Sequence, residues 1–287
     1  MAAVAEAFGL TPTILAVPDG EGLTAALPVF EKRRGPFKAA ALPPLVPVVS
    51  PLFAEPLREA EMHARRSPFD VLLDPLTTRY AQASLLLHPT LNDVRPLVWG
   101  GWSVAPRATY VLGLAGAEDV LGHWSDGPRR TARQHADAYT IVEDRAHAET
   151  AVTLMEASYH RHGTDLGLDG EAVRLLAWAL ADSGHARVFA AISHETDVHE
   201  AALIVAHDER TAYYWIAGSL PGPAMTVLLA HVLPRLRDDG LVLFDFMGAN
   251  VPSIAEFKRR FGARLQPYYH ARHIGGRALR TLNRLRG

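Results

Sequence analysis

The second half of the chain shows a regular order of helical and strand-like hydrophobic patterns. Apolar residues recur at helical spacing in three segments, 146–162, 168–183 and 224–236. Strand-like runs bounded by polar turns lie at 187–193, 198–206, 211–217 and 264–273. We therefore expect two helices, a meander of three strands, a helix, and then a strand, a short helix and a last strand.

The stretch 241–262 supplies the strand and the short helix of that order. Leu241 to Phe246 is apolar except for Asp245, which predicts a strand covered on both faces in a mostly parallel sheet. Gly248 and Asn250 then mark a tight turn. Such a unit directs backbone N–H groups to the carboxyl edge of the sheet, where open α/β sheets bind ligands.

A helix is expected after this turn. Ser253 and Glu256 have the spacing of a capping box, and Gly262 has the position of a helix stop. The helix would place its positive end at the same edge of the sheet. This edge is therefore the predicted place of the chemistry.

The first half is predicted to contain more strands and loops. Strands are expected at 13–17, 23–30, 69–73, 83–87, 109–114 and 139–142, with the first two paired as a hairpin. Helices are expected at 55–66 and at 118–138, the latter with a break at Gly127-Pro128. The proline-rich segment 43–51 favours an extended edge. The loop 88–102 carries Trp99 and Trp102, both expected to be exposed, and is either a lid over a pocket or an ordinary connection.

The composition is that of an ordinary globular protein. Hydrophobic residues make up 48% and charged residues 21%, and 287 residues suffice for two domains. A net charge of -2 argues against a general nucleic-acid binder, so no DNA partner is expected.

The cysteine count and the amino-terminal sequence exclude further classes of function. The absence of cysteine excludes disulfides, thiolate metal sites and a cysteine nucleophile. The first residues lack the basic region of a secretory signal, and no apolar run approaches the roughly 18 residues that cross a bilayer. We expect a cytoplasmic protein without a transmembrane segment.

The order of elements, with FDFMGANVPSIAEFKRRFG and PYYHARH near its end, resembles the Gcn5-related N-acetyltransferase (GNAT) superfamily. The segments LHPTLNDVRPLVWGGW, TYVLGL, TAYYWIAGS and LVLFDFMGAN resemble, more closely, the bacterial branch related to Fem-type peptidoglycan-bridge aminoacyltransferases. The resemblance covers most of the chain.

This resemblance implies an α/β (α+β) fold of two tandem GNAT-like domains, each a mixed, largely antiparallel splayed sheet flanked by helices. It implies a degenerate first domain at 1–114 on the substrate side, and a second at 115–287 with the donor and catalytic site. The tail from about 274 is expected to pack back on the first domain.

Two departures from the family pattern concern the acyl donor. Classical GNATs hold the coenzyme A pyrophosphate with a loop of the form Q/R-x-x-G-x-G/A. The corresponding AGSLPGPAM supplies Gly218 and Gly222, while Pro221 and Pro223 lack N–H groups. The chain also lacks the long helical hairpin of some Fem-type enzymes. Acyl-CoA is the expected donor, and aminoacyl-tRNA is the alternative.

Asp245 and Lys258 are candidates for the chemistry of acyl transfer. Asp245 would bind the acceptor amine or act as a base, or it would support the turn through nearby backbone N–H groups. Lys258 would neutralise a phosphate or carboxylate of the substrate, or it would face solvent on its helix.

Tyrosines are candidate general acids, as they are in many GNATs. Tyr213 and Tyr214 alternate across one strand, and Tyr268 and Tyr269 across another, so one of each pair can reach a cleft. We expect Tyr214 or Tyr268 to act; core packing is the alternative. Further substrate- or donor-binding residues are expected to be Gly218, Gly222, Asn250, Ser253 and Trp102.

The segment HETDVHE, 194–200, lacks the spacing of a zinc site. His194 and His199 are five residues apart and flank a turn, whereas H-E-x-x-H places its histidines four apart on a helix. No metal is therefore expected. Glu200 is either a base or, as we expect, a carboxylate of the turn.

Together, these features predict an N-acyltransferase that moves an acyl group from acyl-CoA to an amine of a small molecule or peptide, in a cleft between the domains. Aminoacyl transfer from tRNA to a peptidoglycan precursor is the alternative reaction. A non-catalytic binding module, in which AGSLPGPAM marks a lost donor site, is the alternative of another class. A monomer and a dimer are both compatible with the sequence.

Overall fold

The computed structural model describes residues 1–55, 67–116, 119–161, 163 and 167–275. Contacts divide the chain into two compact units: Met1–Arg107 with the described residues from Pro267 onward, and Ala108–Gln266. The strands β6 (Ser103–Gly113) and β12 (Arg264–Ile274) each contribute residues to both units. The domains predicted at 1–114 and 115–287 differ from these units chiefly because most of β12 belongs to the first unit. The predicted packing of the tail concerns residues 276–287, which lie outside the described part of the chain.

The first unit is built on a mostly antiparallel sheet. Its other strands are β1 (Thr11–Asp19), β2 (Gly22–Arg34), β3 (Phe37–Ala41), β4 (Leu52–Phe53) and β5 (Gln82–Leu86). The strand order is β1-β2-β3-β5-β12, with β4 beside β2 and a parallel pairing between β3 and β5. The predicted hairpin is confirmed as β1 and β2, joined by a tight turn in which Gly20 has a φ of +58°.

The described helices of this unit are α1 (Ala2–Ala7), α3 (Pro68–Thr78) and α4 (Arg95–Trp99). The strand predicted at 69–73 is wrong, because these residues begin α3. Ser67 caps this helix by accepting a 3.0 Å hydrogen bond from the backbone N–H of Asp70, and Pro68 takes the first helical position. The helix predicted at 55–66 falls on residues 56–66, which are outside the described ranges.

The two tryptophans of the loop 88–102 have opposite environments. Trp102 is 5% exposed and packs in the core of the first unit, with its ring centroid 5.4 Å from that of His273. Trp99, at the end of α4, is 68% exposed. The expectation of exposure is therefore wrong for Trp102, whose ring fills the hydrophobic core.

The second unit contains a mixed sheet in the order β6-β11-β10-β9-β8-β7. Its strands beyond β6 are β7 (Tyr139–Glu143), β8 (Ala186–Ser193), β9 (His199–His207), β10 (Thr211–Ser219) and β11 (Leu243–Asp245). β10 and β11 pair in parallel, and the neighbouring pairs are antiparallel. The predicted three-strand meander is confirmed as β8, β9 and β10.

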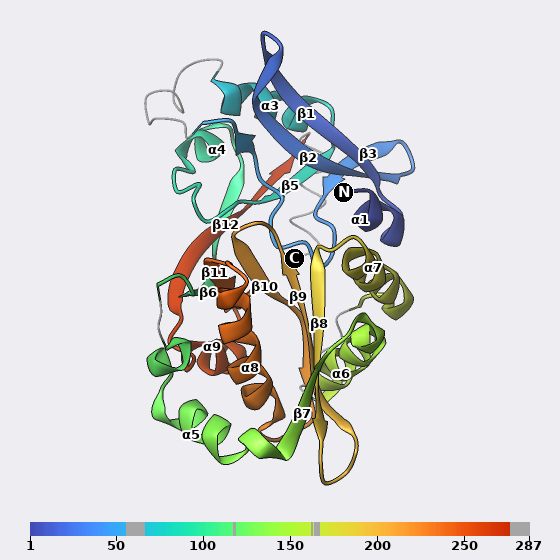
Figure 1. Cartoon of the computed structure of the whole chain (residues 1–287). Coiled ribbons are helices and arrows are strands. Elements are labelled where there is room, and N and C mark those ends of the chain that lie inside the picture. Colours follow the sequence, from blue (N-terminus) through green and yellow to red (C-terminus); the bar gives the residue numbers. More distant parts are fainter. Residues whose placement is uncertain (56–66, 117–118, 162, 164–166, 276–287) are drawn as a thin grey trace. The chain divides into compact units, whose positions relative to one another are not determined.

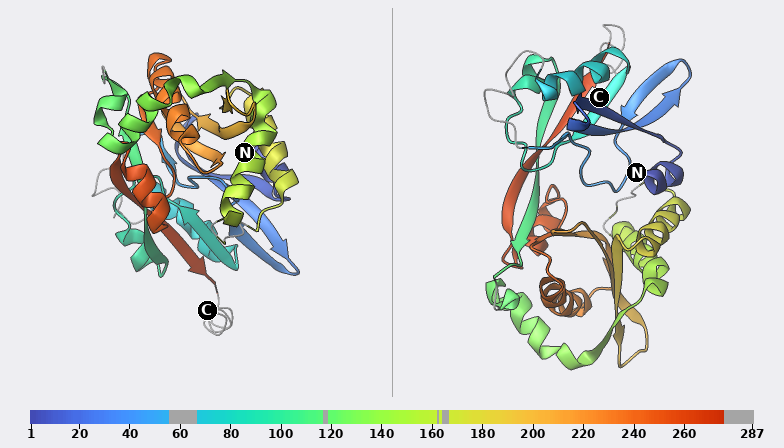
Figure 2. Two further views of the ribbon diagram at one scale, coloured as in Figure 1. Left: turned by 90° about the horizontal axis from the view of Figure 1, so that it is seen from below. Right: turned by 45° about the horizontal axis from the view of Figure 1, so that its top comes forward.

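Helices cover both faces of this sheet. They are η1 (Val120–His123), α5 (Asp126–Gln134), η2 (Ala136–Ala138), η3 (Arg145–His147), α6 (Ala148–Arg161), α7 (Gly170–Asp182), α8 (Ala224–Asp238) and α9 (Pro252–Arg259). Figures 1 and 2 show α6 and α7 on one face and α8 on the other. The helix predicted at 118–138 is divided into η1, α5 and η2, and its predicted break at Gly127-Pro128 lies slightly earlier, at Ser125, which is the N-cap residue of α5.

The core of the second unit lies where α8 and the strand–turn–helix unit at 241–262 meet the sheet. Its fully buried side chains include Leu228, Leu229, Val232, Leu233, Phe244, Phe246 and Phe261. The rings of Phe246 and Phe261 stack with centroids 5.5 Å apart, so α9 is fixed against β11 by aromatic contact. The strand predicted at 241–246 is limited to the three residues of β11, and the prediction that both of its faces are covered is wrong, because Leu243 is 37% exposed. The sheet around it is mixed and not mostly parallel, since β11 pairs in parallel with β10 and antiparallel with β6.

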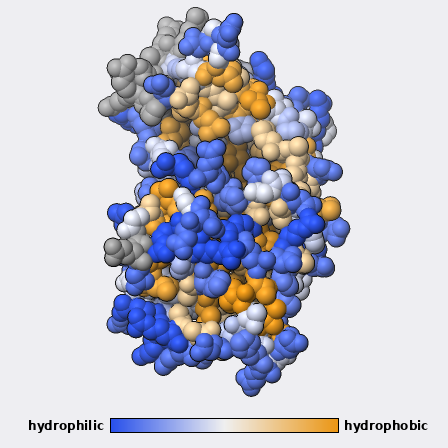
Figure 3. All heavy atoms as spheres, in the orientation of Figure 1, coloured by the Kyte–Doolittle hydropathy of each residue, from blue (hydrophilic) through white to orange (hydrophobic). Residues whose placement is uncertain are grey.

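Figure 3 shows apolar residues gathered around the β1–β2 hairpin of the first unit, where Ile14 and Leu52 are each 61% exposed. Among the described residues, no helix is long and apolar enough to span a bilayer.

Candidate active site

The strands β10 and β11 pair over a short stretch and then diverge. Their parallel register joins Thr211 to Leu243, and it ends where Tyr213 pairs with Asp245. Beyond that point the chain after β11 stays with β6: the N–H of Phe246 donates to the carbonyl of Tyr110 at 2.8 Å. The divergence opens between these parallel strands at their carboxyl ends, which is where the sequence placed the site.

A bulge in β10 lies beside this divergence. Tyr214 pairs with Val205 of β9 and Ile216 pairs with Ile204, so Trp215 is an extra residue in the ladder. A bulge bends its strand and redirects the side chains next to it. Tyr214 thus occupies the point where β10 turns away from β11.

Asp245 ends β11 and is held by two donors. Its Oδ1 accepts a hydrogen bond from the hydroxyl of Thr109 and another, 2.7 Å long, from the backbone N–H of Met247. Both donors stabilise the ionised carboxylate. This geometry matches the predicted turn-supporting role, in which the carboxylate fixes the backbone after β11.

The turn after Asp245 has a left-handed backbone. Met247 has a φ of +50° and Gly248 a φ of +59°, a conformation that costs a residue with a side chain about 1 kcal/mol. Lys258 of α9 offsets this strain, because its Nζ donates to the carbonyl oxygens of Met247 and, at 2.9 Å, Gly248. The lysine therefore holds the turn from inside the protein.

Lys258 is 7% exposed, so the predicted alternative of a solvated helix face is wrong. Burial lowers the pKa of Lys258 to about 8, although the negative charge of Asp245 acts in the opposite direction. Its Nζ lies 5.6 Å from the ring centroid of Tyr214, which is a favourable cation–π distance. The ammonium thus links α9, the turn and β10.

Tyr214 is fixed through its ring. It contacts Phe244 and Phe246 at centroid distances of 6.4 and 6.0 Å. Burial raises the pKa of Tyr214 far above its usual value, and the nearby phenol of Tyr159 on α6 raises it further. Among the described residues, no hydrogen bond engages the Tyr214 hydroxyl, which leaves this protonated phenol available to a ligand.

Thr109 and Tyr159 are parts of this cluster that sequence reasoning missed. Thr109 lies 136 residues from Asp245 in the chain and sits in a strand with no polar motif. Tyr159 falls on a helix whose apolar spacing indicated only core packing. Neither residue carries a sequence signal, because its role depends on a tertiary neighbour.

Three further predicted residues have structural roles in the second unit. Gly218 lets β10 approach α6, since a Cβ there would overlap the backbone of Leu154 and Met155. Asn250 accepts a 3.1 Å hydrogen bond from the N–H of Ala108 and so ties the turn to β6. Gly222 has a φ of +147°, a conformation that favours glycine.

The capping box predicted at Ser253 is wrong. The N-cap position of α9 lies two residues earlier, at Val251, and the helix starts at Pro252. Glu256 instead pairs with Arg259 at 3.0 Å on the exposed face. Proline determined the start, because its fixed φ suits the first turn and its missing N–H is not needed there.

Tyr268 and Trp102 both belong to the first unit, whereas Asp245, Lys258 and Tyr214 belong to the second. Their predicted roles remain predictions.

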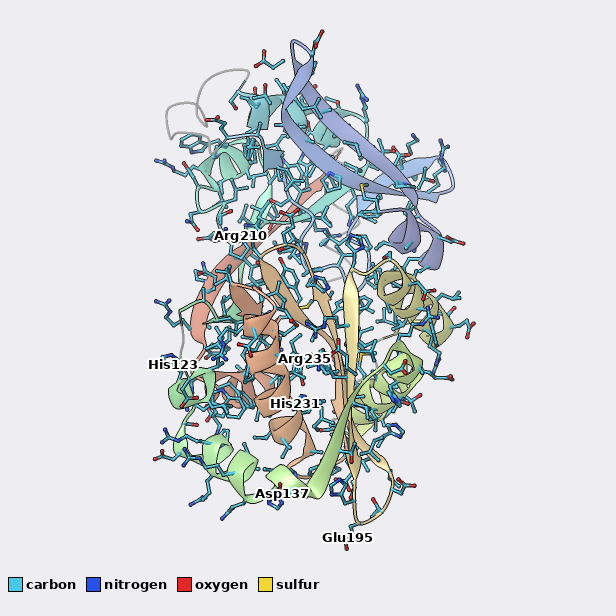
Figure 4. The ribbon with its side chains drawn as sticks, viewed as in Figure 1. His123, Asp137, Glu195, Arg210, His231 and Arg235 are labelled. Atoms are coloured by element: carbon cyan, nitrogen blue, oxygen red, sulfur yellow. The ribbon has the colours of Figure 1, made fainter. Side chains whose placement is uncertain are left out.

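The side chains of the segment 194–200 take part in pairwise contacts. Glu200 accepts a 2.8 Å hydrogen bond from the hydroxyl of Tyr139, and His199 Nε2 lies 3.2 Å from His147 Nδ1. Glu195 sits at the outer tip of the β8–β9 turn (Figure 4). In the described part of the chain, no group of three His, Cys, Asp or Glu side chains could hold a metal ion.

Comparison with known proteins identifies the fold of this site. Residues 126–259 match the family described as the Acetyltransferase (GNAT) domain, a span that contains β10, β11, Asp245 and Lys258. No curated protein matches the chain significantly.

Solved structures extend the similarity over both units. The crystal structure of FemX has a TM-score of 0.75 at 14% identity, covering 98% of this chain and 92% of that chain. The C-terminal domain of a putative lysylphosphatidylglycerol synthetase from Agrobacterium fabrum has a TM-score of 0.60 at 13% identity, covering 98% and 90%. A tandem GNAT protein from the clavulanic acid biosynthesis pathway has a TM-score of 0.53 at 14% identity, covering 93% and 84%. These likenesses confirm the predicted tandem GNAT-type fold and its Fem-like form.

Proposed function

We propose that this protein is an acyltransferase and that it transfers an acyl group to an amine where β10 and β11 diverge. The match of residues 126–259 to the GNAT acetyltransferase family supports this proposal. The observation that carries this proposal is the Tyr214 hydroxyl: the ring is fixed by Phe244 and Phe246, and the hydroxyl has no partner among the described residues. A fixed donor with an unused hydrogen bond is what a reacting carbonyl or leaving group needs.

In the proposed reaction, the neutral amine nitrogen attacks the carbonyl carbon of the donor. A C–N bond forms, the C–S or C–O bond to the leaving group breaks, and the surplus amine proton passes to water. The Tyr214 hydroxyl donates a hydrogen bond to the oxyanion or a proton to the leaving group. Its raised pKa keeps it protonated at neutral pH.

Lys258 and Asp245 act in this proposal as positioning residues. The ammonium of Lys258 donates hydrogen bonds to two backbone carbonyls and lies over the face of the Tyr214 ring, so it orients the turn and the ring. The carboxylate of Asp245 accepts hydrogen bonds from the hydroxyl of Thr109 and from the N–H of Met247. Neither side chain has to contact the substrate to affect the rate.

The donor is either the thioester of an acyl-CoA or the oxygen ester of an aminoacyl-tRNA. GNAT-family membership favours acyl-CoA. The loop from β10 to α8 favours the ester. The N–H of Leu220 already donates to the carbonyl of Glu200, and the prolines Pro221 and Pro223 have no N–H. Few donors are thus left there for a pyrophosphate.

Proton affinity also favours an oxygen ester. A thiol has a pKa of about 8.5, so a thiolate is a weaker base than the phenolate of Tyr214 and would not take its proton. The alkoxide released from an oxygen ester is a stronger base than a thiolate, so it accepts a proton from a phenol more readily. The raised pKa of Tyr214 therefore suits the release of an alcohol better than that of a thiol.

The acceptor is proposed to be an amine of a small molecule or peptide. The names of two structural neighbours, FemX and lysylphosphatidylglycerol synthetase, belong to proteins of the same fold and give direction to the choice of acceptors. Peptidoglycan precursors and amine-bearing small molecules are therefore the first acceptors to screen.

Ligand-dependent thermal unfolding tests the donor. A ligand that binds the native state alone raises the unfolding midpoint, by an amount that grows with its concentration over Kd. Coenzyme A, acetyl-CoA, and charged and uncharged tRNA would be titrated in parallel. A saturable shift with coenzyme A supports the thioester donor, and a larger shift with charged than with uncharged tRNA supports the ester. No shift with any of them favours the non-catalytic binding module.

A further inference from the structure

Strand β12 of the first unit presents a polar row on one of its faces. Ala271 is fully buried in the hydrophobic core, and His270 and Arg272 on either side of it point to the opposite face. His270 pairs with Leu86 of β5, and Arg272 pairs with Ser84. Two basic residues are thus fixed on a central strand, not on a loop.

The guanidinium groups near this row have no carboxylate partner in the part of the chain that the structure describes. Neither Arg272 nor Arg107, on the neighbouring strand β6, takes part in an ion pair within the described residues. Arg272 is held by the side-chain oxygen of Gln82, to which its Nη2 donates at 3.2 Å. Arg107 is exposed. Within the described ranges, the positive charge of this face therefore has no carboxylate partner.

Two buried nitrogen atoms of the row also lack hydrogen bonds. These atoms are Nε2 of His270 and Nε of Arg272, both inaccessible and unpartnered among the described residues. A buried polar nitrogen without a hydrogen-bond partner destabilises the fold. Both side chains are only partly buried, so a change of rotamer would turn either nitrogen toward a ligand that completes its hydrogen bonding.

We propose that Arg107, His270 and Arg272 form a binding site for a phosphoryl group on the first unit. Two guanidinium groups and one imidazole can neutralise a phosphate dianion, and planar guanidinium groups match phosphate oxygens in pairs. All three residues belong to the first unit, whereas β10 and β11 belong to the second. The observations behind this proposal are therefore different from those behind the acyl-transfer proposal.

The protonation of His270 agrees with this assignment. Burial lowers the pKa of His270, and the positive charges of Arg107 and Arg272 lower it further. A bound phosphate would reverse the electrostatic part of this effect, so the ligand gains from a histidine that becomes charged beside it.

Two sources could supply the phosphoryl group, a soluble phosphate ester or a phospholipid headgroup. The test uses the full chain in two arms. Inorganic pyrophosphate is titrated by calorimetry, and vesicles of phosphatidylglycerol are compared with vesicles of phosphatidylcholine by cosedimentation. Arg107→Gln and Arg272→Gln are the test variants, and Arg79→Gln, an exposed arginine of the same unit, is the matched control.

We expect saturable binding in at least one arm, weakened about ten- to hundredfold by Arg107→Gln and Arg272→Gln and unchanged by Arg79→Gln. Binding of pyrophosphate alone assigns a soluble ligand, and binding of phosphatidylglycerol vesicles assigns a lipid headgroup. Because Arg107 is exposed, its replacement should leave the thermal midpoint unchanged and keep the test valid if Arg272→Gln misfolds. No saturable binding in either arm, or equal weakening in Arg79→Gln, overturns the proposal.

Discussion

The buried ammonium of Lys258 should give the protein a distinctive dependence of stability on pH. Burial lowers the pKa of this group from 10.5 to about 8. At one pKa unit for each 1.36 kcal/mol, the fold disfavours the charged lysine by about 3 kcal/mol relative to the neutral one. Replacement by methionine removes that penalty and keeps most of the side-chain volume.

The sign follows from the protons bound in each state. Below pH 8 both the folded and the unfolded chain hold the proton, so Lys258 contributes no slope. Between pH 8 and 10.5 the unfolded chain keeps the proton and the folded chain releases it. The free energy of unfolding therefore rises with pH in this window, by about 3 kcal/mol in total.

At pH 7 the Lys258→Met variant should be close to wild type in stability. It leaves the carbonyls of Met247 and Gly248 without their donor, which costs about 1–3 kcal/mol, but it no longer buries a charge. At pH 10 the wild type should exceed the variant by about 3 kcal/mol more than at pH 7. The turn should be less ordered in the variant at every pH, so acyl transfer should fall.

Equilibrium unfolding in guanidinium chloride at pH 7, 8, 9 and 10 measures this difference, since the salt screens exposed charges and leaves the buried one. The control is Arg259→Gln on the exposed face of the same helix, which should follow the wild-type pH profile. Other titrating groups are common to all three proteins and cancel in the comparison. Parallel profiles for wild type and Lys258→Met would refute the assigned burial of the charge.

Two further substitutions test the geometry around the site. Thr109→Val should lower the free energy of unfolding by about 1–3 kcal/mol, because it removes a donor from the carboxylate of Asp245; Thr109→Ser should restore it in chemical denaturation. Gly218→Ala should cost about 3 kcal/mol through overlap with α6, whereas Gly113→Ala, with open space at its Cβ position, should cost less than 1 kcal/mol by the same measurement.

The periodic segments of the second half could be predicted well. Helices α6, α7 and α8 and strands β8, β9 and β10 all fall within a few residues of their expected positions. Each has a long, regular apolar pattern that ends at a glycine, a proline or a polar turn, so local and tertiary preferences agree. The fold could be inferred from their order together with the 241–262 motif.

The errors arise where a short polar or proline signal competes with an apolar run. Residues 69–73 contain the apolar run of a strand, but Ser67 and Pro68 before them start a helix. At α9, Pro252 fixes the first turn, and Ser253 is left inside the helix. In both places the residue just before or at the first turn decided the structure.

Some residues of the candidate site could be predicted from the sequence, but their contacts could not. Asp245, Lys258 and Tyr214 were selected because they are polar residues in or next to apolar segments. Burial of Lys258 could not be predicted, because it depends on the left-handed turn at Met247, whose conformation no local signal indicates. The partnership with Thr109 is likewise a tertiary contact.

The most direct test of the account is acyl transfer by the wild type and by Tyr214→Phe. Labelled acyl groups would be followed from acetyl-CoA and from aminoacyl-tRNA to a panel of amines, with Tyr213→Phe as the neighbouring control. The account predicts transfer by the wild type and by the control, and a rate about 10²- to 10⁴-fold lower for Tyr214→Phe at unchanged thermal stability. Equal rates for wild type and Tyr214→Phe would contradict the role of the hydroxyl, and no transfer from either donor would contradict the proposed function.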